Sequence, residues 1–422
     1  MHSNPAPEQD FRLGAGEFVA MMAMLMALQA MSIDSMLPAL GAIASDLKVT
    51  DPNQRQLVVG VFLISAGLGA LLPGSLADRY GRRPVLFVSL GLYIGLALAC
   101  ALVSDFSTLL VLRALQAIGS AGLTVLPSAI IRDRFEGDQM ARMLSTISVV
   151  FMIVPILAPT FGQFVLLFAG WRWIFGGMAM MAAVVGVWVF LRLPETLHPE
   201  YRQKIVPVVI AGNMWTAATD RASIGYVVGS SLVLGGLFGY INSAQQLVAE
   251  HFGAGRYFPL LFAATAAGMA VANFTNSRIV ERFGARRVSH AALLCFIGVS
   301  GLQVAAAFSP AETLWSFMPL MAANMCLIGF IGANFGSIAL QPFARIAGAA
   351  ASLQAFVRMV IGSTLGALIG LAYDDSARPL AVALLIGGFA SLGLVLYSEN
   401  GRLFRRLLPP GVPRPIPEAT VH

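Results

Sequence analysis

Twelve long apolar segments follow one another along this chain of 422 residues, and they limit its possible folds more than any other feature. They begin near Phe18, Leu57, Val85, Leu109, Leu144, Ile174, Ile224, Phe258, Val288, Leu314, Ala347 and Leu380. A helix needs about 20 apolar residues to cross the hydrocarbon core of a membrane, and the strands of a membrane barrel are about half as long. A lone strand would leave its backbone amides unpaired in lipid. The segments therefore predict an all-α integral membrane protein with twelve transmembrane helices.

The charged residues support a membrane protein and give its orientation. They make up 11% of the chain, against about a quarter in ordinary soluble domains. With both termini in the cytoplasm, twenty basic residues fall on the cytoplasmic side, and five fall outside: Lys48, Arg55, Arg172, Arg256 and Arg378. This positive-inside bias favours the assumed orientation. The net charge of +6 therefore serves orientation, and because the basic residues are spread over several loops it gives no reason to expect nucleic acid as a partner.

A short charged loop occurs twice, once in each half of the chain. GSLADRYGRRPVL begins at Gly74, and the altered copy SRIVERFGARRVS begins at Ser277. Matching Asp78 to Glu281 displaces the copies by 281 − 78 = 203 positions, about half the chain. We therefore expect two six-helix bundles, 1–192 and 222–422, related by a pseudo-two-fold axis along the membrane normal. The polar stretch 193–221 between them is expected to be a cytoplasmic connector with an interfacial helix.

Seven stretches in fixed order resemble one transporter family. They are the first loop copy, DSMLPAL from Asp34, LLVLRALQAIG from Leu109, IIRDRF from Ile130, PILAPTFGQ from Pro155, GWRWIF from Gly170 and LPETL from Leu193. Together they resemble the major facilitator superfamily, and within it the twelve-span drug:proton antiporters of the bicyclomycin-resistance type, over Gly16 to Gly401. The second loop copy departs with Ser277 and Ala285, and the fifth span has Ala158 and Gln163 where many relatives carry Gly.

The resemblance implies a function and a location. It implies a proton-coupled secondary active transporter in the bacterial cytoplasmic (inner) membrane that exports drugs or other amphipathic molecules by alternating access. A dedicated exporter or importer of one metabolite, such as a siderophore or a sugar-like compound, is the alternative. The implied partners are a small-molecule substrate, the proton and lipid, and we expect a monomer.

The first loop copy is the expected conformational latch. The resemblance assigns to it the residues Gly74, Asp78, Arg79, Gly81 and Arg82, which would hold the outward-open state from the cytoplasmic side. A loop that only orients the protein has no need of an acid, because acids contribute little to orientation. Asp78 can instead accept hydrogen bonds from the neighbouring bundle in one state. The alternative is that these charges only fix topology.

Two charged residues lie inside the first and fourth spans. Asp34 lies ten residues before Ala44, hence ~15 Å deep, and Arg113 lies six residues past Ser107, ~9 Å deep. A carboxylate in a membrane helix indicates a functional site. Burial raises the pKa of a carboxyl group and a nearby guanidinium lowers it, so changes in hydration can load or unload a proton. Because the family places these spans side by side, Asp34 and Arg113 are the expected proton-coupling pair. A static buried pair, or Asp34 as a cap before Pro38, is the alternative.

The resemblance also implies an antiporter motif and a binding cavity. The motif in span five is Pro155, Ala158, Pro159 and Gly162, which would seal the two halves against leak or simply allow tight packing. The cavity is expected between spans one, four, seven and ten. Its candidate substrate-binding residues are Met26, Gln29, Tyr240, Asn242, Gln245, Met321, Asn324, Met325 and Arg358. Arg358 in span eleven either binds an anionic substrate or pairs with Gln354 one turn earlier.

Nothing in the sequence indicates an enzyme. Neither lysine follows a glycine, so no P-loop is present, and the five histidines are scattered over loops and ends. The three cysteines lie inside spans without paired spacing. We therefore expect no catalytic residue, no metal site and no cofactor.

Overall fold

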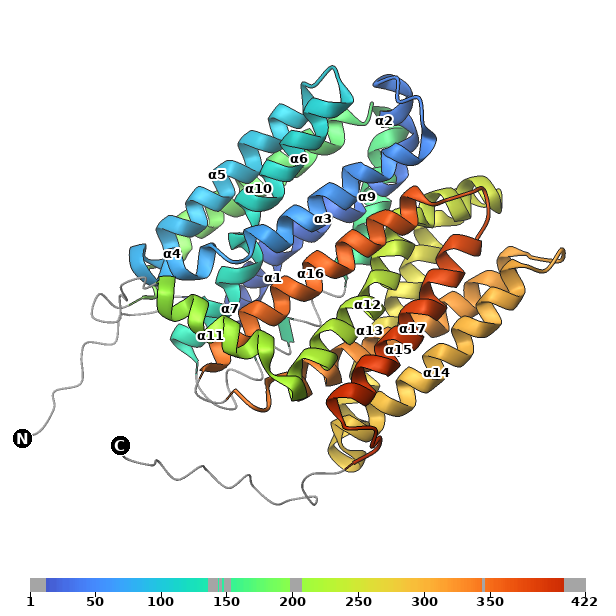
Figure 1. Ribbon diagram of the computed structural model, residues 1–422. Coiled ribbons are helices and arrows are strands. Elements are labelled where there is room, and N and C mark those ends of the chain that lie inside the picture. The colour runs from blue at the N-terminus through green and yellow to red at the C-terminus, as the bar shows by residue number, and fades with distance from the viewer. Residues whose placement is uncertain are drawn as a thin grey trace, which may run out of the picture.

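The structure is a computed structural model that describes residues 13–135, 143, 146–147, 153–197, 207–343 and 346–405. Within these ranges every regular element is a helix, and the helices form two bundles that lie side by side (Figure 1).

The helices of the N-terminal bundle are repeatedly broken. They are α1 (Ala15–Asp34), η1 (Leu37–Ala39), α2 (Leu40–Asp46), η2 (Pro52–Gln56), α3 (Leu57–Gly69), α4 (Pro73–Tyr80), α5 (Arg82–Ala101), α6 (Phe106–Ser120), α7 (Gly122–Arg134), α9 (Val154–Phe168) and α10 (Arg172–Arg192). Pro38 cannot continue the α1 hydrogen-bond ladder, and the chain tightens into a 3₁₀ turn there. Pro73 opens α4, which is bent 42° from α3. The first, second and fourth crossings are therefore interrupted spans.

The helices of the C-terminal bundle are longer and mostly continuous. They are α11 (Pro207–Thr219) of the connector, α12 (Arg221–Gln245), η4 (Gln246–His251), η5 (Gly255–Tyr257), α13 (Phe258–Phe283), α14 (Ala285–Ala307), α15 (Leu314–Leu340), α16 (Ala347–Leu371) and α17 (Arg378–Ser398). The Asp220 carboxylate accepts from Ser223 N at the start of α12, and Thr313 and Ser316 form a capping box at the start of α15. These caps fix where the helices begin.

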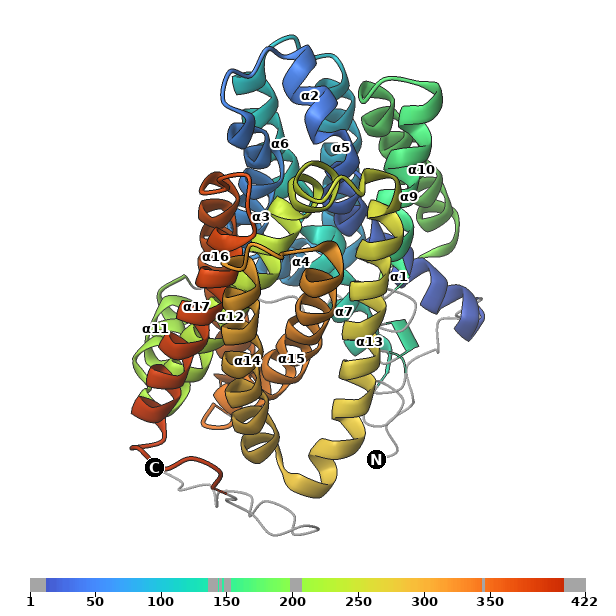
Figure 2. The same cartoon turned by 90° about the vertical axis from the view of Figure 1, so that its right-hand side faces the viewer.

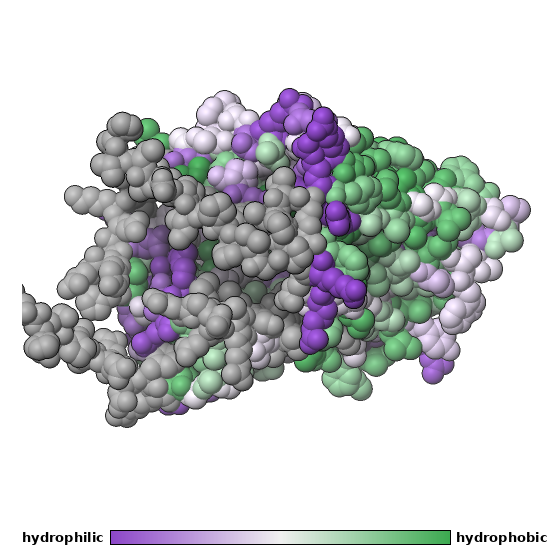
Figure 3. Space-filling model, turned by 90° about the horizontal axis from the view of Figure 1, so that it is seen from below, coloured by the Kyte–Doolittle hydropathy of each residue, from purple (hydrophilic) through white to green (hydrophobic). Residues whose placement is uncertain are grey.

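The expected twelve-span, all-helical architecture is confirmed. In the described part of the chain, ten helices are long and apolar enough to cross a membrane, and the bent pair α3 and α4 makes an eleventh. The shorter apolar α9 supplies the remaining crossing; the beginning of that span, near Leu144, lies outside the described residues. A band of hydrophobic residues runs between two more hydrophilic ends of the molecule (Figure 3). This is the surface that a lipid bilayer requires.

The two bundles meet along two helix pairs, α3 with α16 and α9 with α13 (Figures 1 and 2). Glycines on α3 make the first contact close. A Cβ on Gly60 would lie 2.9 Å from the Ala367 Cβ, and one on Gly67 would lie 2.9 Å from the Met359 Cβ. Small residues let helix backbones approach in the same way in other membrane proteins.

Polar contacts join the bundles at one end, which we call the η2–η4 end. The Asn53 side-chain amide donates to the carbonyl oxygens of Leu371 and Tyr373, at 3.1 and 2.7 Å. The Arg55 guanidinium pairs with the Glu250 carboxylate at 2.6 Å. The two bundles are therefore tied together at the η2–η4 end. We call the opposite end of the molecule, which contains α4 and α11, the basic end.

Candidate functional site

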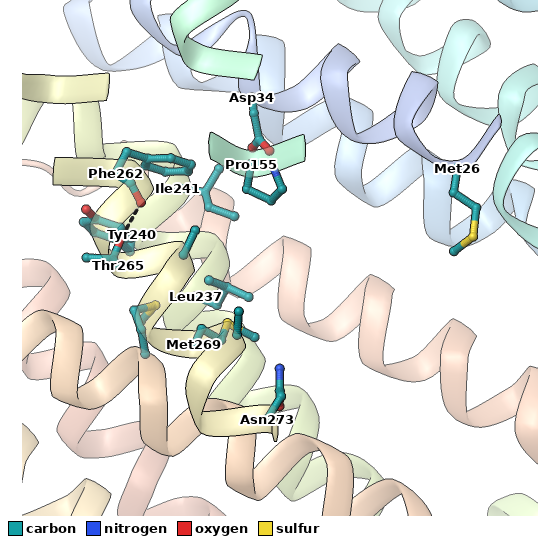
Figure 4. A pocket seen from close by; sticks show the side chains of 13 residues that line it. Met26, Asp34, Pro155, Leu237, Tyr240, Ile241, Phe262, Thr265, Met269 and Asn273 are labelled. Carbon is teal, nitrogen blue, oxygen red and sulfur yellow. Dashed lines mark hydrogen bonds between the residues drawn. The ribbon is translucent and has the colours of Figure 1, made fainter. Parts of the chain in front are cut away.

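A cavity of about 360 Å³ lies between the two bundles (Figure 4). Its walls are mostly apolar and rich in methionine and aromatic rings. The lining residues are Met26 and Asp34 from α1, Pro155 from α9, Leu237, Tyr240 and Ile241 from α12, Phe262, Thr265, Ala266, Met269, Ala270 and Asn273 from α13, and Met325 from α15. Methionine is flexible and polarizable, so such walls adapt to ligands of different shape.

Asp34 is the acidic residue of this cavity. It is the last residue of α1, at the break before Pro38, and its side chain faces the cavity beside Pro155 (Figure 4). Only 6% of its surface is exposed. Within the described part of the chain, no hydrogen bond or ion pair includes its carboxylate, so nothing supports a capping role. A buried carboxylate that faces a cavity without a partner is suited to exchange a proton.

Arg113 does not pair with Asp34 in this structure, and the expected partnership is absent among the described residues. The Arg113 side chain is fully buried, and its Nη2 donates to Ser32 O at 2.7 Å. Met36 N bonds to Ile33 O where α1 ends, and the last carbonyls of a helix lack partners in the helix itself. The break in α1 thus offers Arg113 a backbone acceptor two residues before Asp34.

The other contacts of Arg113 also lie in the N-terminal bundle. Its Nη1 donates to the Gln116 amide oxygen at 2.9 Å, and its Nε donates to Val58 O at 3.3 Å. The guanidinium carbon lies 4.1 Å from the centre of the Phe62 ring, a cation–π contact. Arg113 therefore holds α1, α3 and α6 together.

The predicted substrate-binding residues divide into two groups. Met26, Tyr240 and Met325 line the cavity, and Arg358 lines a second cavity beside it. The others do not line either cavity: Gln29, Asn242, Gln245, Met321 and Asn324. Asn242 bonds to Phe238 O of its own helix, and the Asn324 side chain accepts from Ser300. In this conformation their amides are used for packing of helices.

The helices around the cavity differ from the expected set. Spans one, seven and ten contribute as predicted, but α6 and α7 of span four do not line it, and α13 of span eight contributes more lining residues than any other helix. The family-level expectation missed this helix. A sequence signal was available, because Thr265, Met269, Asn273 and Asn276 recur every three or four residues and so share one face of α13.

The span-five motif packs against the break in α1. A Cβ on Gly162 would lie 2.1 Å from Ser35 O, which forbids any larger residue there. Ala158 is fully buried, Pro159 is also buried, and Pro155 lines the cavity. The close contact of Gly162 is thus within the N-terminal bundle, and α9 itself packs against α13 of the other bundle.

The predicted latch residues form a charge cluster at the basic end. Arg82 bonds to the Asp78 carboxylate at 2.5 Å and to the Asp133 carboxylate at 2.8 Å. The Asp78 side chain keeps 41% of its surface exposed. Arg79 is exposed over the Tyr80 ring. In this structure the latch contacts lie within one bundle.

Two residues of this cluster were missed by sequence reasoning. Asp133, within IIRDRF, binds Arg82, and Glu195, within LPETL, accepts from the backbone N–H groups of Arg82 and Arg83. Gly81 makes this possible. Its φ is +105°, and a Cβ there would lie 2.5 Å from the Glu195 carboxylate, so only glycine fits. Gly74 lies on α4, where a Cβ would meet Val125 at 3.9 Å.

The second loop copy forms a more enclosed cluster in the C-terminal bundle. Gly284 repeats the left-handed turn of Gly81, with φ +85°. Arg286 pairs with Glu399 at 2.7 Å, and Tyr226 donates to the same carboxylate at 2.6 Å. Burial raises the pKa of Glu399, but the hydrogen bonds from Tyr226 and Arg286 outweigh burial and hold the pKa below its usual value.

Comparisons with known proteins agree with this architecture. The sequence profile of the Major Facilitator Superfamily matches residues 19–367. A bicyclomycin resistance protein homolog of Haemophilus influenzae is 29% identical over 370 residues, which cover 86% of this chain and 91% of that protein. The multidrug resistance protein MdtL of Klebsiella pneumoniae is 29% identical over 377 residues, with the same two coverages.

Solved structures share the fold at low sequence identity. A bacterial homolog of the human lysosomal transporter Spinster, solved in an inward-facing and unoccupied conformation, superposes with a TM-score of 0.66 at 17% identity, over 93% of this chain and 96% of that one. The human organic anion transporter MFSD10 gives a TM-score of 0.62 at 16% identity, over 92% and 100% of the two chains. With the family profile matching most of its length, this chain belongs to the Major Facilitator Superfamily and is a membrane transporter.

Proposed function

We propose that this transporter exports amphipathic small molecules, drugs among them, in exchange for protons across a bacterial cytoplasmic membrane, with both termini in the cytoplasm. The observation that carries the proposal is Asp34, a buried carboxylate without a partner among the described residues, which faces an apolar cavity between the two bundles. The names of the similar resistance proteins support the substrate class.

The proposed cycle is alternating access between the two bundles. The contacts at the η2–η4 end join the two bundles on what we take to be the outer side. In the outward-open state these contacts would separate, and Asp78 of the latch would exchange its Arg82 contact for one with the other bundle. A partly exposed carboxylate at the basic end is free to make such a contact.

Asp34 would carry the proton, and Arg113 would position it. Arg113 donates a hydrogen bond to the carbonyl oxygen of Ser32, two residues before Asp34, and so fixes the orientation of the end of α1 toward the cavity. A substrate that enters the cavity removes water from Asp34, which changes its affinity for a proton. Proton and substrate binding are thereby linked through one side chain.

The first prediction tests this link with Asp34→Asn, which removes the titratable group and keeps the shape of the side chain. We expect the variant to insert and fold normally but to lose substrate-driven proton movement in proteoliposomes that carry a pH-sensitive dye. Asp375→Asn is the matched control. It makes the same change on an exposed loop, at a positive φ that asparagine adopts as readily as aspartate.

The outcome is decided by proton movement together with substrate flux. Wild-type proton coupling in Asp34→Asn would rule out Asp34 as the proton carrier. Coupling lost equally in Asp375→Asn would show that the preparation, and not the cavity carboxylate, is at fault.

A further inference from the structure

The second cavity is lined by a cation that has no partner among the described residues. This cavity has a volume of about 240 Å³ and lies in the C-terminal bundle, lined by residues of α12, α13, α15 and α16. Arg358 on α16 is its charged residue, and no acid lines it. Among the described residues, Arg358 makes no hydrogen bond and no ion pair, and its buried Nε has no acceptor. A lone cation at membrane depth requires a partner or a water-filled cavity.

A second donor, Gln354, lies close to Arg358, although it is not among the residues that line the cavity. Gln354 lies one turn before Arg358, only 6% of its surface is exposed, and its side-chain nitrogen is buried without a hydrogen bond. A Cβ on Gly336 of α15 would lie 3.3 Å from the Gln354 nitrogen and 3.4 Å from the Arg358 Nη1. Two groups of N–H donors thus converge on one glycine. Two N–H donors cannot bond to each other, and no Arg358–Gln354 hydrogen bond is present among the described residues, so the expected pairing does not form in this structure.

The two cavities adjoin each other. Met269 and Asn273 of α13 line both. In the first cavity, Asp34 lies at one end and Asn273 at the other (Figure 4). A ligand can therefore place an apolar body in the first cavity and a polar group in the second, away from Asp34.

We propose that the second cavity binds the oxyanion of an amphipathic organic anion, a carboxylate or a group of like shape, through Arg358. An oxyanion supplies the acceptors that the Arg358 guanidinium lacks, and this planar group can bond to both oxygens of a carboxylate. The apolar part of the ligand lies against the methionine and aromatic walls of the first cavity. This inference deepens the proposed function, on which it rests, by naming the substrate class.

The test compares two probes of nearly the same shape, the anion 2-naphthoate and the neutral 2-naphthamide, in which an NH2 group replaces one carboxylate oxygen. Binding of each to the purified full-length protein is measured by isothermal titration calorimetry in neutral detergent. We expect the wild type to bind naphthoate about tenfold to a hundredfold more tightly than the amide, as a charge-assisted hydrogen bond in a buried site provides. In Arg358→Gln this preference is lost, and the affinity for naphthamide stays unchanged.

Matched variants distinguish a specific effect of the Arg358 charge on naphthoate binding from the general effect of removing a cation from the protein. Arg358→Lys keeps the charge but loses the fork, so a reduced preference for naphthoate remains. Arg256→Gln removes an exposed cation on η5, outside both cavities, and leaves the preference intact. Equal binding of the two probes to the wild type, or a preference that survives in Arg358→Gln, would overturn the proposal. Thermal unfolding of each variant shows that it is folded.

Two further measurements are needed. The first distinguishes a lipid headgroup from a substrate as the source of the anion, and the second separates failure of the anion site from failure of the proposed function. Added phosphatidylglycerol that abolishes naphthoate binding would assign the site to a lipid headgroup and overturn a substrate site. Proton-coupled export is measured separately, with Asp34→Asn as its negative control. A protein that selects naphthoate but moves no protons would keep the anion site and contradict the exporter. Proton-coupled export of neutral compounds alone, without selectivity for naphthoate, would support the exporter and contradict the anion site.

Discussion

In the part of the chain that the structure describes, each bundle has an arginine in the middle of an apolar helix, Arg113 and Arg358, and the surroundings of the two are opposite. Arg113 in the N-terminal bundle donates to two backbone carbonyls and one amide, and it lies against the Phe62 ring. Arg358 in the C-terminal bundle makes no such contact among the described residues, and it lines a cavity. The sequence context of the two is alike, a lone arginine in an apolar helix. The contacts show that the first ties helices together, whereas the second has donors free for a ligand.

The largest expected effect is on the stability of the folded protein, which should fall when Arg113 is replaced but not when Arg358 is replaced. Arg113→Met leaves the carbonyls of Ser32 and Val58 and the Gln116 amide without their donor. Each buried polar group left without a partner costs about 1–3 kcal/mol. Arg358→Met removes no contact, so its stability should match or exceed that of the wild type. Thermal unfolding of the purified proteins in one detergent measures both. Equal losses in the two variants would show that Arg358 is as structural as Arg113.

The two loop copies show a similar contrast at the basic end. In the first copy, Asp78 is half-exposed and bonds to Arg82. In the second, Glu399 is buried and receives bonds from both Arg286 and Tyr226. The exposed acid can change partners during transport, and the buried one fixes α12, α14 and the end of α17 together.

Glu399→Gln is therefore expected to destabilise the protein by about 1–3 kcal/mol at neutral pH, because a charge-assisted network is lost. The pKa of Glu399 is lowered in the folded state. Its contribution is thus fully present above the unfolded value of about 4.3 and is lost as the pH falls through the folded value. The stability difference between wild type and variant should shrink at acid pH. A difference that is constant with pH would mean that the Glu399 charge does not contribute.

Asp78→Asn should have a smaller effect on stability, about 0–1 kcal/mol for an exposed ion pair, and a distinct effect on conformation. If Asp78 bridges the bundles in the outward-open state, the variant shifts the population toward inward-open several-fold or more, as expected for a coupling of ~1–3 kcal/mol. Labelling of single cysteines placed at the basic end and at the η2–η4 end measures the ratio. An unchanged ratio would make Asp78 a topology residue.

The sequence predicted the fold because transmembrane spans are long and apolar. It also predicted which charged residues lie inside these spans. It did not predict their partners. The Asp34–Arg113 pair was expected from similar depth, but the break at Pro38 exposes a carbonyl that competes for the guanidinium. The role of α13 was missed because a family pattern was followed in place of the polar face at Thr265, Asn273 and Asn276. Depth along a helix can be read from a sequence, whereas rotation about its axis and breaks in its ladder depend on packing.

The smallest expected effect concerns the glycine beside Arg358. Gly336→Ala places a methyl group 3.3 Å from the Gln354 nitrogen and 3.4 Å from the Arg358 Nη1, both at the ends of flexible side chains. The fold should tolerate it, since alanine is a better helix former than glycine by up to about 1 kcal/mol. The donors must move apart, so naphthoate binding should weaken a few-fold while naphthamide binding does not change. Gly332→Ala is the matched control, because Gly332 lies one turn earlier on the same helix, lines the second cavity, and a Cβ there meets nothing within 4 Å. If both substitutions weaken the binding of naphthoate and of naphthamide alike, the cavity selects its ligand by volume. The free donors of Arg358 would then have no role in binding that sets this arginine apart from Arg113.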